Sequence, residues 1–192
     1  MHFLNYTPQR ERFIQLLWGL LFTKCFIAEH YVQAHAVPIA SWLYVWGLSL
    51  SMATVATIVF WRLRTTEHVP SQGPRAIVVG WVLGLGAGIM CVLLAWLTPW
   101  LSTGGLMVAL SVILAGGYGW QGWHSRARLD WLAAVGWCLM AGLQLTIPAD
   151  VALLVFGLSL LAWVVLPLAC KLILDWYQGK AAVRALYIAN DI

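Results

Sequence analysis

Charged residues are scarce in this chain. Of its 192 residues, 9% are Asp, Glu, Lys or Arg, whereas 62% are hydrophobic. Soluble domains carry about a quarter of their residues as charged side chains, so this chain has too few to cover a surface that faces water. The composition therefore excludes an ordinary soluble domain.

Sequence motifs for catalysis and metal binding are missing as well. The chain contains no CxxC, no H-E-x-x-H, no phosphate-binding loop and no Gly-rich dinucleotide turn. His30 and His35 are five residues apart and do not share a helix face. They are therefore poorly placed to act as paired ligands of a haem iron. We therefore expect no catalytic residue, no metal site and no cofactor. The cysteines lie singly inside apolar segments, as small apolar fillers do; they are Cys25, Cys91, Cys138 and Cys170.

Six long apolar segments are what the chain does contain. Runs near twenty apolar residues predict helices that span a bilayer, because backbone polar groups in lipid must be satisfied within the segment. We expect one all-α integral membrane domain over residues 1–192, with six transmembrane helices arranged as three helical hairpins. The approximate spans are 13–33, 39–61, 76–97, 106–123, 131–147 and 151–174.

The positions of Lys and Arg predict the orientation. All of them except Lys24 lie in the N-terminal lead, in the second and fourth connections, or toward the C-terminus. Short cytoplasmic segments collect such residues, so both termini are predicted to be cytoplasmic and the protein to be a multi-pass protein of the cell inner membrane. The net charge of +4 is explained by this distribution, and we expect no nucleic-acid partner.

Two patterns concern helix packing. Gly80, Gly84 and Gly88 recur every four residues, a spacing that forms a groove where another backbone approaches closely. Packing within one chain is the favoured interpretation, and a subunit interface is the alternative. In addition, each outer turn holds a proline and is followed by a similar tetrapeptide, which indicates either three related hairpins or chance in a Leu-rich chain. The serines of these tetrapeptides are Ser49, Ser111 and Ser159.

The first segment carries the unusual charges. Lys24 lies in its apolar middle, and a cation near the bilayer centre is a functional hypothesis by default. On an ideal helix Lys24 shares a face with Tyr31 and His35, while Glu29 lies about 140° away and is a poor partner for it. The alternative is that Lys24 extends toward the outer interface. The residues predicted to contact a ligand or partner are Lys24, Glu29, His30, Tyr31 and His35.

Three functions fit this pattern, and no motif identifies a family. The favoured hypothesis is a non-catalytic accessory protein or complex subunit that acts through helix–helix and lipid contacts, with membrane lipids, other membrane subunits or a second copy as partners. The alternative is a small-solute transporter or channel with Lys24 and Glu29 near its pathway. A lipid-modifying enzyme is the third, and it would have to use Glu29, His30 and His35. The polar candidates for a pathway are Thr23, Lys24, Ser49, Ser51, Thr54, Thr57, Ser111, Gln144 and Ser159.

Overall fold

The fold consists of helices and connections over the described part of the chain. The computed structural model describes the backbone of residues 7–62, 75–98, 102–126 and 128–190, and no strand occurs in these ranges. The all-α prediction is therefore confirmed. The elements in chain order are α1 (Thr7–Ala34), η2 (Trp42–Gly47), α2 (Leu48–Arg62), α3 (Arg75–Leu97), α4 (Thr103–Ser125), α5 (Arg128–Gln144), α6 (Ala152–Leu160), η3 (Leu161–Val165) and α7 (Leu166–Asn190).

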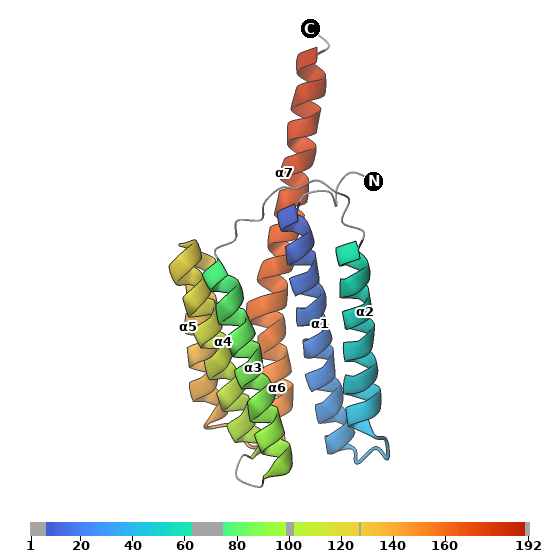
Figure 1. The fold of residues 1–192 in the computed structure, drawn as a ribbon, viewed down its shortest axis with the longest axis vertical. Helices are drawn as coiled ribbons and strands as arrows, with labels where there is room; N and C mark the ends of the chain where they lie inside the picture. The colour runs from blue at the N-terminus through green and yellow to red at the C-terminus, as the bar shows by residue number, and fades with distance from the viewer. Residues whose placement is uncertain (1–6, 63–74, 99–101, 127, 191–192) are drawn as a thin grey trace.

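The helices run alternately up and down one long axis, where η2 with α2, and α6 with η3 and α7, each count as one continuous helix (Figure 1). The start of α1 lies at the same end of the bundle as the end of α2 and the start of α3, and α7 extends beyond the other helices at this end. Residues 63–74, which are predicted to form a loop with part of the cytoplasmic charge, lie outside the described residues.

The continuous helix formed by α6, η3 and α7 lies at the centre. It packs against α1 on one side and against α4 and α5 on the other, while α2 packs on α1 and α3 packs on α4. The contact between α4 and α5 is the most extensive one in the described chain, and α5 touches α6 much less. Small side chains explain the close α4–α5 approach, since a Cβ atom on Gly119 would stand 3.8 Å from that of Ala134. In the predicted third hairpin, formed by residues 131–147 and 151–174, the contact between the two helices is therefore smaller than the contact of α5 with α4.

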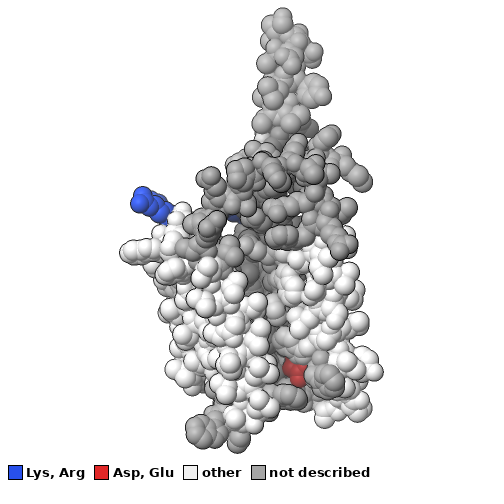
Figure 2. All heavy atoms as spheres, viewed as in Figure 1, with Lys and Arg blue, Asp and Glu red and all other residues white. Residues whose placement is uncertain are grey.

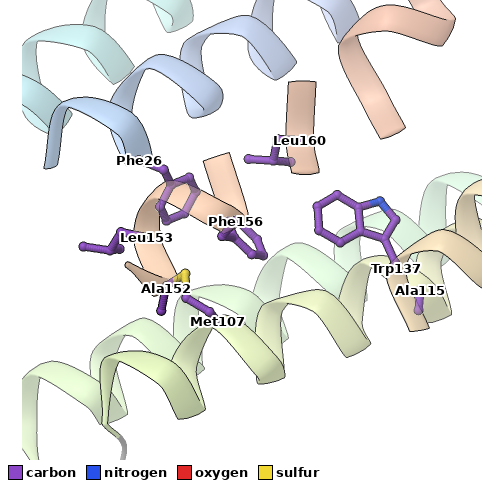
Figure 3. Packing of buried hydrophobic residues seen from close by; sticks show 8 residues of the cluster. All are labelled: Phe26, Met107, Ala115, Trp137, Ala152, Leu153, Phe156 and Leu160. Carbon is purple, nitrogen blue, oxygen red and sulfur yellow. The ribbon is translucent and has the colours of Figure 1, made fainter. Parts of the chain in front are cut away.

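The core lies where α1, α4, α5 and α6 meet (Figure 3). Phe156 is its central side chain, with ring centroids 4.7 Å from Phe26 and 5.4 Å from Trp137. Trp137 is fully buried, so α5 contributes the largest side chain of this core. The other members of the cluster are Met107, Ala115, Ala152, Leu153 and Leu160.

Two π-helical segments interrupt the α-helical pattern in the described ranges. One is η2, at the start of the predicted span 39–61, and the other is η3, inside the predicted span 151–174. The second segment ends just before Pro167, whose ring lacks an N–H group and would clash with the carbonyl group four residues earlier in a regular helix. A widened turn at this place lets the helix continue, and it extends to Asn190.

Two helices are long and apolar enough to cross a membrane within the described chain, Thr103–Ser125 and Ala152–Gln178. The apolar stretches Leu43–Val59 and Val79–Ala95 are shorter. The bundle surface between the helix ends shows little charge in the view of Figure 2, where acidic atoms form one small area toward the lower end and basic atoms lie at the upper end.

Candidate functional site

Hydrogen bonds from polar side chains join α1 to the continuous helix formed by η2 and α2. We call this contact the α1–α2 seam. Because the two helices are antiparallel, residues with increasing numbers along α1 contact residues with decreasing numbers along the other helix. The contacts are Trp18 Nε1 to Thr57 Oγ1 (3.0 Å), Lys24 Nζ to Ser49 Oγ (2.9 Å), Cys25 Sγ to the Val45 carbonyl oxygen (3.3 Å) and Trp46 Nε1 to Glu29 Oε2 (3.2 Å). The seam therefore contains both charges that the first predicted span carries in its interior.

Glu29 is the most densely hydrogen-bonded side chain of the seam. Its Oε1 atom accepts from Ser41 Oγ at 3.1 Å and from Gln33 Nε2 at 3.0 Å, and its Oε2 atom accepts from the Trp46 indole. Each carboxylate oxygen thus has at least one donor, which offsets the cost of placing this group among apolar side chains. Glu29 consequently ties α1 to the start of the second helix.

The π-helical segment η2 positions two of the groups that donate hydrogen bonds to Glu29, the Ser41 hydroxyl and the Trp46 indole. Its wider turn is closed by the Leu48 N–H group, which donates to the Leu43 carbonyl oxygen five residues earlier. A regular helix would put Ser41 and Trp46 about 140° apart, since each residue advances 100°. The π-helical turns reduce this angle, and both side chains reach the same carboxylate. Segments of this type occur frequently at functional sites.

Lys24 is exposed, whereas its hydrogen-bond partner Ser49 is 5% exposed. An ammonium group has three N–H donors, and Lys24 has no carboxylate partner among the described residues. Lys24 lies ten residues before the end of α1, so it stands about 15 Å from that end. The structure therefore holds a cation partway along α1, at the level of Ser49.

The remaining predicted contact residues point in other directions. His30 Nδ1 lies 2.9 Å from the Asp150 carbonyl oxygen, where a protonated Nδ1 donates to the turn between α5 and α6. Tyr31 and His35 are exposed and stack on one another with centroids 4.2 Å apart, and His35 Nδ1 lies 3.0 Å from the Tyr31 carbonyl oxygen. The five predicted residues thus do not converge on one site.

The three glycines of α3 that recur every four residues face side chains of α4. A Cβ atom on Gly84 would meet Ile113 Cγ2 at 3.7 Å and one on Gly88 would meet Leu110 Cδ2 at 3.6 Å, while Gly80 lies under the indole of Trp120. We expected a neighbouring backbone in this groove, but the nearest atoms belong to side chains. The groove has a volume of about 390 Å³; it is lined by Val79, Gly80, Leu83, Gly84, Ala87, Ile113, Gly116, Gly117 and Trp120.

Among the side chains that the structure describes, five polar ones are buried, and all of them belong to the predicted pathway candidates. They are Thr23, Ser49, Ser111, Gln144 and Ser159. The three serines of the possible repeat are thus all inside. Ser111 and Ser159 donate to carbonyl groups four residues earlier in their own helices. Among the described residues, the Thr23 hydroxyl and the Gln144 carbonyl oxygen have no partner.

The residues that hydrogen-bond to Glu29 from the second predicted span were not among the predicted site residues. Ser41 and Trp46 belong to the second span, and hydropathy gives no reason to pair them with an acid of the first. The signal that was available is the polar Ser41 itself, close to the turn that contains Pro38. Ala36 in this turn adopts a left-handed conformation with φ of 47°, which helps the chain to reverse direction.

Comparisons with known proteins add no family to this geometry. None of the protein-family models, curated proteins or solved structures that were compared matches the chain. The α1–α2 seam, the glycine groove and the large apolar side chains exposed on the bundle are therefore the observations from which a function can be proposed.

Proposed function

We propose that this chain is an integral membrane protein whose six helices cross the bilayer, and that it acts as a non-catalytic accessory protein or complex subunit. The observation that carries the proposal is the number of large apolar side chains exposed around the bundle. Leu83 is 68% exposed, Leu139 is 67% exposed and Met52 is 65% exposed, and they belong to three different helices. Soluble monomers rarely expose extensive apolar patches, whereas lipid tails cover such surfaces readily.

The proposed orientation puts both termini in the cytoplasm. The helix ends at Arg62, Arg75 and Arg128 lie at one end of the bundle, together with the start of α1. The connections at the opposite end contain no Lys or Arg. Positively charged loops remain in the cytoplasm during insertion, so the basic end is the cytoplasmic one.

A binding role is favoured over catalysis because the acid and base side chains of the first helix are engaged in structural hydrogen bonds. Glu29 and His30, which an enzyme of this kind would need as acid and base, both hold α1 against neighbouring segments. Lys24, by contrast, is exposed on the outside of the bundle. The charged group that is presented outward is thus suited to a partner.

A small-solute transporter or channel is the second candidate. The five buried polar side chains support it, and so do the unpartnered Thr23 hydroxyl and Gln144 carbonyl oxygen. Transport of this kind would be measured as solute or ion flux into vesicles that contain the purified protein. Flux above that of empty vesicles, lost in Gln144→Met, would favour this candidate.

One experiment tests the favoured proposal in two stages. Membranes from cells that express the full chain are first washed at alkaline pH, and the protein is expected to stay in the pellet. It is then purified in mild detergent and weighed by native mass spectrometry, where a second protein in fixed ratio is expected. Release by the alkaline wash would contradict the membrane assignment. A lone chain that carries only lipid would contradict the subunit assignment.

A further inference from the structure

One face of α1 turns away from the bundle and has Lys24 at its middle. Leu20 is 47% exposed and Tyr31 is 57% exposed, and Lys24 and His35 are exposed as well. These positions follow one another at intervals of four, seven and four residues, which places them in one stripe along the helix. Thr23, Cys25 and Phe26 lie on the other side and are buried. We call the four exposed residues the Lys24 face.

The charge on this face lacks a counter-charge in the described chain. Ser49 accepts one hydrogen bond from Lys24 and carries no charge. The acid nearest in sequence, Glu29, already accepts from Ser41, Gln33 and Trp46. An uncompensated cation inside a bilayer is costly, and such residues pair with other groups. A carboxylate supplied from outside the chain satisfies this requirement.

We propose that the Lys24 face docks a transmembrane helix of a different membrane protein, and that this helix carries an Asp or Glu at the depth of Lys24. The inference rests on the proposed membrane location. A lipid phosphate is disfavoured because Lys24 lies about 15 Å along the helix from the nearer end of α1 and its ammonium is hydrogen-bonded to Ser49. A second copy is disfavoured because the carboxylate of Glu29 is occupied by its three donors.

Synthetic helices test the docking directly. The full chain is reconstituted into phosphatidylcholine vesicles, and energy transfer is measured to labelled Leu/Ala-rich peptides with a single central Glu or, as the matched probe, Gln. We expect the Glu peptide to bind more tightly by roughly five- to thirtyfold, which corresponds to one interhelical polar contact. Lys24→Met should abolish this preference. Lys171→Met, the same change on another helix, should keep it.

A charge exchange keeps the test decisive if Lys24→Met misfolds. Lys24→Glu is expected to reverse the preference, so that a peptide with a central Lys binds more tightly than the Glu peptide. Equal binding of the Glu and Gln peptides to the wild type would overturn the proposal, as would a Glu preference that survives in Lys24→Met.

Competition identifies the other occupants. Loss of the Glu preference when phosphatidylglycerol replaces part of the phosphatidylcholine would assign the site to lipid phosphate and overturn the proposal. Displacement of the peptide by unlabelled Lys24→Met chain, which lacks the docking cation but keeps Glu29, would assign it to a second copy, with the same consequence. The alkaline wash is performed first, so a protein that remains integral and shows no preference contradicts the docking alone and leaves the proposed function intact.

Discussion

The indole of Trp120 on α4 lies over Gly80 on α3, in the space that a Cβ atom at position 80 would occupy. The same relationship recurs between Trp163 and Gly136, where the nearest ring atom would stand 2.7 Å from such a Cβ atom. Glycine at these positions lets an aromatic ring come close to the backbone of a neighbouring helix. The contacts between α3 and α4, and between α5 and η3, therefore depend on the absence of a side chain.

Gly80→Ala should destabilise the bundle. The added methyl group would overlap the Trp120 ring, and overpacking of this type costs roughly 1–3 kcal/mol. Gly86→Ala is the matched control on the same helix, because nothing lies within 4 Å of its Cβ position. Thermal unfolding in detergent should show a lower midpoint for the first variant and an equal or higher one for the second. Equal unfolding midpoints for the two variants would mean that the Trp120 ring does not pack against Gly80 of α3.

Glu29→Gln should loosen the α1–α2 seam. An amide offers one acceptor oxygen in place of two, so the Trp46 indole or the Ser41 hydroxyl loses its acceptor, at a cost of roughly 1–3 kcal/mol. Gln33→Ala removes only the exposed contact and should change stability by about 0.5 kcal/mol or less. Both variants are compared by thermal unfolding in the same detergent, and an equal loss in the two would argue against a central role for Glu29.

Gln144→Met tests whether a buried amide is needed for stability. Its Nε2 atom makes one long contact of 3.4 Å to the Ala152 carbonyl oxygen, and its Oε1 atom has no partner among the described residues. Replacement by an apolar side chain of similar shape should leave the unfolding midpoint unchanged or raise it. Ser111→Val, which removes a hydroxyl group that is hydrogen-bonded, serves as the comparison. A large loss of stability for Gln144→Met would reveal a partner for its oxygen.

Lys24→Met should increase the efficiency with which the first span inserts. A lysine at the centre of a helix costs about 2.5–3.5 kcal/mol on insertion scales, and methionine removes this cost. The measurement is the inserted fraction of residues 7–34 in a host protein with glycosylation tags on both sides. Lys171→Met, tested in its own span, should have a smaller effect because Lys171 is nearer the basic end of the bundle. An unchanged inserted fraction for Lys24→Met would mean that Lys24 already reaches an aqueous interface.

Single cysteines report the orientation. In a background without the native cysteines, Ser102→Cys and Ala149→Cys should react with an impermeant maleimide from outside the cell. Ser71→Cys, in the loop outside the described residues, should react only after the membrane is opened. The positive-inside distribution of Lys and Arg is the reason for this expectation. Labelling of position 71 from outside would reverse the proposed orientation.

The sequence was sufficient for the helices and their order. Runs of apolar residues between polar or Gly- and Pro-containing connections determine where helices form, because backbone hydrogen bonds within one segment need no distant partner. The range predicted as 76–97 accordingly matches α3, Arg75–Leu97, almost residue for residue. Agreement is poorer at residues 39–61, where the π-helical η2 occupies the first turns. Hydropathy is insensitive to whether a turn contains an extra residue.

Only the tertiary structure decided which side chains meet. The sequence placed Lys24 and Glu29 on different sides of one helix, because helical periodicity relates positions within one helix and contains no information about the neighbouring helix. The partners Ser49 and Trp46 lie 25 and 17 residues away, on a helix whose rotation is set by packing and by the π-helical turns of η2. The contact of Trp120 with Gly80 was likewise not determined by the sequence, since a row of glycines can accommodate either a neighbouring backbone or an aromatic ring. Such contacts depend on helix rotation and depth, which are fixed jointly by all the packed side chains and by none of the local segments alone.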